Sequence, residues 1–159
     1  MVSNNRIARN RLAKELEEIE RNPPIELSVG PVDDNLFHWE GILHGPLDSP
    51  YEGGLFRFRV DFTADYPNKA PKIRFISRVF HPNISRNGDI CVDLLQKQWS
   101  SAYTLTQAMI CISSLLTDPN TGSPLNPMSA QLYETDRQKY NSTVREWVRI
   151  YASAESLDM

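Results

Sequence analysis

The feature that most constrains the fold of this chain is a strict alternation of side-chain character around residue 60. The segment Phe56–Phe62 reads FRFRVDF, so apolar side chains occupy every second position and charged side chains fill the positions between them. Successive side chains of a β-strand point to opposite faces, so one face of this strand is buried and the other meets water. A sheet with one wet face is typical of an antiparallel meander and disfavours a parallel sheet covered on both sides.

Weaker alternating runs predict three further strands. Apolar residues at helical spacing predict helices before and after the strands in the chain. The strands are expected over residues 25–29, 36–43 and 72–76. Apolar stripes at helical spacing occupy residues 8–19, 105–116 and 129–154. Ser3 or Asn4 is expected to cap the first helix and Thr104 the second, while the last stripe forms one helix or a pair. This order predicts an α+β fold, in which a four-stranded antiparallel meander sheet carries an N-terminal helix and C-terminal helices, and a single domain spans residues 1–159.

Composition argues against several classes of function. The formal net charge of −3 argues against a protein that binds the phosphate backbone of nucleic acid. No apolar run is long enough to span a bilayer, and the first residues lack the pattern of a signal peptide, so no membrane partner is expected. Cys91 and Cys111 do not make the disulfide framework of a small secreted protein, and Cys111 is interpreted as a packing or helix-surface residue. We therefore expect a cytoplasmic or nuclear location, and no metal site, because the cysteines and histidines lack ligand spacing.

Reactive groups concentrate in one loop rich in turn residues. Between His81 and Leu95 the sequence places Cys91 close to an imidazole, to the amide of Asn83 and to the carboxylate of Asp93. Cysteine, histidine and asparagine can together supply a nucleophile, an orienting group and a donor to an oxyanion. Each residue also has a structural interpretation, because a free cysteine often packs in a core and asparagine favours turns. Both interpretations stay open from these residues alone.

The loop belongs to a longer series of motifs with characteristic spacing. The series comprises Ser49-Pro50-Tyr51-Glu52-Gly53-Gly54, Tyr66-Pro67, His81-Pro82-Asn83, Gly88-Asp89-Ile90-Cys91, Trp99-Ser100, Asp118-Pro119-Asn120 and Pro124-Leu125-Asn126. With this series the chain resembles the ubiquitin-conjugating enzymes over residues 4–154, most of all their short-core ubiquitin carriers, with a short N-terminal extension. The resemblance implies an acyltransferase that accepts ubiquitin from a ubiquitin-activating enzyme and passes it to lysine amines or to a RING or HECT ligase. It implies no bound cofactor, because ATP is used by the activating enzyme.

The resemblance assigns a role to each reactive residue of the loop. Cys91 is implied to carry the C-terminal glycine of ubiquitin as a thioester. Asn83 is implied to support the oxyanion or the loop, and His81 to be structural and to hold Asn83 in place. Asp93 is implied to lie near the incoming lysine, whose proton a carboxylate can help to remove.

Further positions are implied to surround these residues. A groove for the ubiquitin tail and its gate are formed by Leu94, Leu95, Asn120 and Ser123. Ser123 stands where related enzymes often have aspartate, so it is either a gate that phosphorylation could charge or an ordinary turn residue. Ser28 matches a position on the open sheet face where some members bind a second ubiquitin.

A ligase-facing surface is also implied. Its members are Arg11, Asn68, Ser101 and Ala102. Asn68 replaces a bulky apolar residue, and Ser101 replaces a proline. Because buried apolar anchors usually dominate such interfaces, we expect common RING domains to bind this chain weakly.

Two alternative functions stay open at this point. The modifier could be a ubiquitin-like protein rather than ubiquitin. A different class is a cysteine protease that uses Cys91 with His81 and Asn83. The three residues are crowded into one loop, whereas the partners of a protease cysteine usually come from distant segments.

Overall fold

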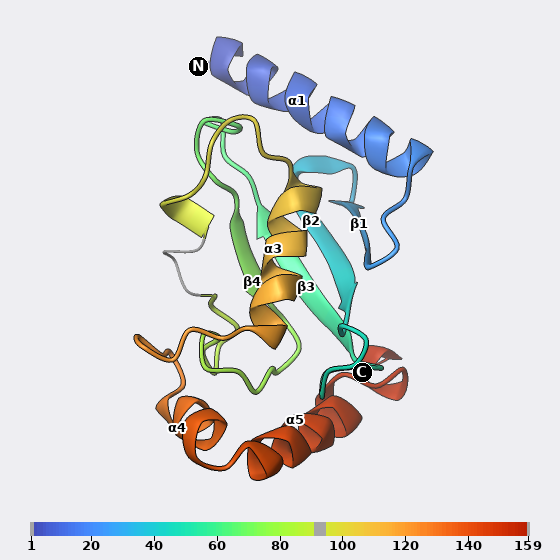
Figure 1. Cartoon of the computed structure of the whole chain (residues 1–159). Helices are drawn as coiled ribbons and strands as arrows, with labels where there is room; N and C mark the ends of the chain where they lie inside the picture. Colours follow the sequence, from blue (N-terminus) through green and yellow to red (C-terminus); the bar gives the residue numbers. More distant parts are fainter. Residues whose placement is uncertain (1, 91–94, 159) are drawn as a thin grey trace.

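The computed structural model describes residues 2–90 and 95–158, and its helices and strands follow the predicted order. The elements are α1 (Val2–Arg21), β1 (Leu27–Val32), β2 (Asn35–His44), β3 (Leu55–Asp61), β4 (Lys72–Phe75), α3 (Leu105–Thr117), α4 (Pro127–Thr135), α5 (Arg137–Tyr151) and the 3-10 helix η1 (Glu155–Asp158). Figure 1 shows α3 lying across one face of the sheet, α1 beyond one end of it, and α4 and α5 at the opposite end. Among the described residues, no helix is both long and apolar enough to cross a membrane.

The sheet is the predicted four-stranded meander, with the strands in the order β1-β2-β3-β4 and every neighbouring pair antiparallel. On β3 the alternation is confirmed, because Phe56, Phe58 and Val60 are buried whereas Arg57 and Arg59 on the other face are only half-buried. The α+β fold class predicted from the alternation is therefore the observed one.

The first strand differs from the prediction, since it runs from Leu27 to Val32 rather than over residues 25–29. Leu27 pairs with Leu43, and beyond it the carbonyl of Glu26 accepts a hydrogen bond from the N–H of His44, the last residue of β2, at 2.8 Å. Ile25 accordingly lies outside the strand and is 92% exposed. At the other end, Val32 pairs with Asn35 and closes the hairpin to β2.

The helices follow the apolar stripes, but their first residues differ in two places. Helix α1 begins at Val2, so Ser3 and Asn4, the predicted caps, lie within the helix rather than before it. Helix α4 begins two residues earlier than predicted, after Asn126, whose side chain caps it. The predicted cap at Thr104 is confirmed and forms a capping box with Gln107.

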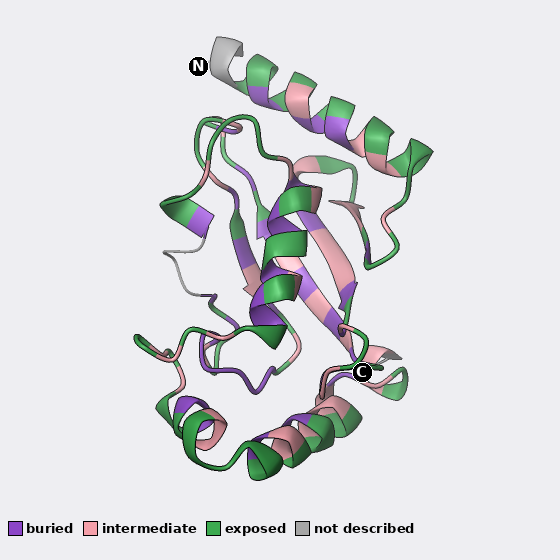
Figure 2. Ribbon diagram, in the orientation of Figure 1, coloured by how far each residue is buried: buried purple, intermediate pink, exposed green. Residues whose placement is uncertain are grey.

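The core lies between the sheet and α3. Figure 2 shows buried positions along the side of α3 that faces the strands and exposed positions along the other side. The buried stripe comprises Leu105, Ala108, Met109, Ile112, Leu115 and Leu116. From the sheet, Trp39 and Phe58 are fully buried, and each such side chain contributes roughly 2–3 kcal/mol of burial free energy. A rigid layer of this kind fixes where the loops at its edges begin and end.

Candidate active-site loop and its supports

The segment His81-Pro82-Asn83 is anchored through the imidazole of His81, which is fully buried. Its Nδ1 accepts a hydrogen bond from the backbone N–H of Asn83 at 2.9 Å, so its Nε2 carries the proton and donates to the carbonyl of Leu115 at 2.7 Å. Burial lowers the pKa of His81 to about 4, although the hydrogen bond to Leu115 opposes this shift. The ring is therefore neutral near pH 7, with both nitrogens engaged, and offers no general base.

The side chain of Asn83 joins this segment to the connector that follows α3. Its Nδ2 donates to the carbonyl of Asn120 at 2.7 Å, and its Oδ1 accepts from the N–H of Asn120 at 2.8 Å. The side-chain amide therefore makes two hydrogen bonds to the backbone of Asn120, one donated and one accepted, as paired residues in a β-sheet do. The side chain of Asn120 accepts in turn from the N–H of Gly122 at 2.9 Å, which shapes the connector into a turn. Asn83 and Asn120, both predicted from the sequence, thus form one unit.

The connector is held at two further points that sequence reasoning missed. The carbonyl of Pro82 accepts hydrogen bonds from the N–H groups of Leu125 at 2.8 Å and Asn126 at 3.1 Å. The hydroxyl of Thr121 donates to the carboxylate of Glu134 on α4. Backbone acceptors leave no mark in a residue pattern, so nothing in the sequence pointed to these contacts of the Pro82 carbonyl. Ser123 lies between these anchors and is exposed.

Residues 84–90 form a narrow hairpin-like loop that leads to residue 91. Ile84 and Ile90 form an antiparallel bridge, and the N–H of Ser85 donates to the carbonyl of Asp89 at 2.8 Å. Gly88 has a φ of 89°, and its carbonyl accepts from the N–H of Phe75 at 2.9 Å. A Cβ at Gly88 would come within 1.9 Å of the Phe75 carbonyl oxygen, so only glycine fits there. The chain is therefore fixed up to Ile90, which is buried.

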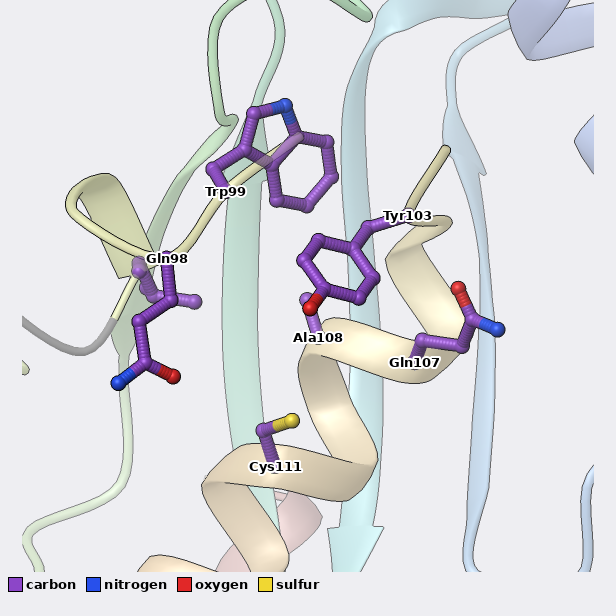
Figure 3. Close-up of a pocket in the computed structure, with 7 residues that line it drawn as sticks. Gln98, Trp99, Tyr103, Gln107, Ala108 and Cys111 are labelled. Carbon is purple, nitrogen blue, oxygen red and sulfur yellow. The ribbon is translucent and has the colours of Figure 1, made fainter. Parts of the chain in front are cut away.

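Cys91, Asp93 and Leu94, three of the residues predicted from the sequence, lie outside the described residues. The next described residue, Leu95, is buried and lines a small pocket between α3 and the loop that precedes it. The lining residues are Leu95, Gln98, Trp99, Tyr103, Gln107, Ala108 and Cys111. Figure 3 shows the sulfur of Cys111 directed into this pocket from α3. Cys111 is an exposed free cysteine, as its interpretation as a helix-surface residue allows.

The residues predicted to face a ligase lie on α1 and on two loops, which contain Asn68 and residues 100–103. Asn68, Ser101 and Ala102 are exposed, whereas the guanidinium of Arg11 is turned inward toward the backbone carbonyls of the loop at residues 100–103. The indole N–H of Trp99 donates to the carbonyl of Pro67 at 2.8 Å and joins two of the segments.

Ser28 lies away from these segments, exposed on the open face of the sheet. It lines a broad hollow there together with Ile42 and Arg57. Within residues 2–90 and 95–158, no group of three or more histidine, cysteine or acidic side chains could hold a metal ion.

Comparison with known proteins identifies the family and the fold of this chain. A family model described as ubiquitin-conjugating enzyme matches residues 11–148. The chain belongs to the ubiquitin-conjugating enzyme family. A solved structure assigned as a ubiquitin-conjugating enzyme from Plasmodium yoelii is similar to it, with 36% sequence identity and a TM-score of 0.87 over 92% of this chain and 96% of that one. This ubiquitin-conjugating enzyme is a transferase, and its family implies interaction in general terms with ubiquitin, an activating enzyme and ligases.

Proposed function

We propose that this enzyme accepts ubiquitin on Cys91 as a thioester and transfers it to a lysine amine or to a ligase. The thiolate of Cys91 attacks the thioester of the charged activating enzyme, a new carbon–sulfur bond forms, and the thiol of the activating enzyme leaves. In the second step the amine attacks the same carbonyl, the bond to Cys91 breaks, and the lysine proton is lost as the isopeptide bond forms. ATP is used by the activating enzyme, and we propose no bound cofactor for this chain.

The observation that carries this proposal is the frame in which His81 and Asn83, shortly before Cys91 in the chain, are bonded to each other and to Asn120 of the connector. The frame fixes the chain up to Ile90, and the loop lies within the residues 11–148 that the family model matches, which supports Cys91 as the acceptor. Both nitrogens of His81 are engaged inside the frame, so the imidazole has no role as a base for Cys91. A thiol without such a base suits a carrier, which must hold an acyl group without passing it to water. The same observation disfavours a cysteine protease.

The incoming lysine must be desolvated or deprotonated, because an amine with a pKa of about 10.4 is almost wholly protonated near pH 7, and a carboxylate can aid this step. We propose Asp93 for this role on the strength of the family motif. For Asn83 the pairing with Asn120 favours a role in holding the connector. Its Nδ2 has a second hydrogen beyond the one given to Asn120, so donation to an oxyanion is also part of the proposal.

The decisive experiment is incubation with ATP, an activating enzyme and one modifier at a time. Ubiquitin is expected to give a conjugate that a reductant cleaves, and the Cys91→Ser variant a conjugate that resists the reductant, or none. The Cys111→Ala variant is the matched control and should charge normally. If only a ubiquitin-like protein is charged, that protein and not ubiquitin is the modifier. A thioester on the Cys91→Ala variant would overturn the assignment of Cys91. We also propose a cytoplasmic or nuclear location, which the two cysteines of the chain led us to expect.

A further inference from the structure

Arg11 uses its guanidinium inside the molecule, on the loop between Trp99 and α3. Its Nη1 donates to the carbonyl of Ser101 at 2.9 Å and its Nη2 to the carbonyl of Tyr103 at 2.7 Å. The side chain is 24% exposed. A planar guanidinium can hold two carbonyls at a fixed separation, which a lysine ammonium cannot reproduce.

The guanidinium is itself held by Glu15, one turn later on α1. The Nε of Arg11 lies 2.9 Å from Oε2 of Glu15, whose side chain is only 7% exposed. Glu15 also accepts hydrogen bonds from the hydroxyl of Tyr66 and, at 2.9 Å, from the N–H of Leu105. Burial raises the pKa of Tyr66 well above its usual value, and the bond to Glu15 adds to this, so the phenol stays a donor. Charge-assisted bonds of this kind are about twice as strong as neutral ones.

These bonds connect α1, the turn that contains Tyr66 and the first turn of α3. The loop at residues 100–103 contacts these elements. Within the loop, the N–H of Tyr103 donates to the carbonyl of Ser100 at 3.0 Å and closes a turn. The indole of Trp99 ties the same loop to Pro67. The exposed side chains at the two tips, Asn68 and Ser101, are thereby fixed relative to each other.

We propose that Arg11 is a positioning residue, which sets the 100–103 loop for ligase docking and does not itself serve as the charged docking contact. The inference rests on the proposed function and deepens it. It separates Arg11, which positions the loop, from the exposed predicted residues that would contact the ligase. A direct charge contact needs an outward guanidinium, whereas all three nitrogens of Arg11 have partners within the chain.

The test compares Arg11→Ala and Arg11→Lys with a control, Arg21→Ala. The control removes one arginine from the same helix, and Arg21 is an exposed residue that pairs with Glu17 and Glu18 on α1. Hydrogen exchange is measured at the amides of Ala102 and Tyr103, with Ile84 as the reference. Discharge is followed from pre-charged protein, with and without the RING or HECT ligase that gives the largest rate, and the ratio of the two rates is compared.

Both Arg11 variants are expected to exchange about tenfold faster at Ala102 and Tyr103 and to lose most of the ligase stimulation, since each loses at least one charged bond to the loop. The reference amide and the control variant should not change. Full stimulation in Arg11→Lys would show that the charge alone matters and overturn the proposal. Unchanged loop exchange in Arg11→Ala would overturn it as well, as would a wild type that no ligase stimulates. Failure of the proposed function is seen separately, as a wild type that never forms the reductant-sensitive conjugate.

Discussion

The buried polar side chains of His81, Asn83 and Glu15 have defined partners, and this limits the roles that each can play. The imidazole of His81 bridges the backbone of Asn83 and the last turn of α3, which makes it a structural clamp. The sequence already favoured a structural histidine, but its partner Leu115 lies 34 residues away. The carbonyl of Leu115 has no regular helical partner four residues on, because Pro119 lacks an N–H, and this is the signal that could have suggested a further donor there.

Asn83→Ala is expected to slow transfer to free lysine by about a hundredfold while charging stays close to normal, if the amide supports the tetrahedral centre. Single-turnover charging and discharge are measured separately. The variant also frees the backbone of Asn120, so a loss of about 2 kcal/mol in unfolding free energy is expected. Equal losses in charging and discharge would instead point to a collapsed loop.

Ser123→Asp tests the gate. The Asp118–Asn126 connector is anchored on both sides of Ser123, so a carboxylate there would be held near the active-site loop. It should speed discharge onto free lysine and shift the pH profile of the rate toward lower pH, because it favours loss of the lysine proton. Charging involves no lysine and should not change. A rate and profile equal to those of the wild type, with Ser123→Ala as control, would leave Ser123 as a turn residue.

Helices and strands were predictable where their own sequence period decides the contact. The FRFRVDF run determines which face of β3 is buried, and the α3 stripe determines which side of that helix meets the sheet. Contacts between backbone and a distant side chain were not predictable. The bonds of Arg11 to Ser101 and Tyr103 span 90 and 92 residues, and they depend on the packing of α1 rather than on any local pattern.

The exposed residues at two loop tips lead to a prediction about which ligases the enzyme engages. Asn68 and Ser101 are exposed and polar, whereas the family resemblance leads us to expect apolar residues there. The double variant Asn68→Phe with Ser101→Pro is therefore expected to increase RING-stimulated discharge severalfold. The substitution leaves the carbonyl of Ser101, which Arg11 binds, in place. Stimulation is measured over a panel of RING ligases, with Asn68→Ala and Ser101→Ala as the control. Strong stimulation of the wild type across the panel would contradict the prediction.

The stability of the whole molecule should depend on pH through His81. Its pKa is about 4 in the folded protein and about 6.5 in an unfolded chain, so between these values the unfolded state binds a proton that the folded state does not. The unfolding free energy therefore falls as the pH falls from about 6.5 to about 4, by roughly 3 kcal/mol in total, and this contribution levels off below. Urea unfolding between pH 4 and 7 measures the slope. His81→Gln should be less stable at pH 7 and should have a smaller slope. An equal slope in both proteins would contradict the assignment.

The loop that leads to Cys91 also closes an open edge. Strand β4 is four residues long and stands last in the sheet, so its outer backbone groups could pair with a strand from another molecule. The N–H of Phe75 donates to the carbonyl of Gly88, and Arg74 pairs with Asp89 in an isolated bridge. At the opposite edge, Pro31 removes one donor from β1. A substitution that loosens the loop is therefore expected to appear first as self-association of the enzyme, so tolerance of this segment to change is limited by solubility as well as by chemistry.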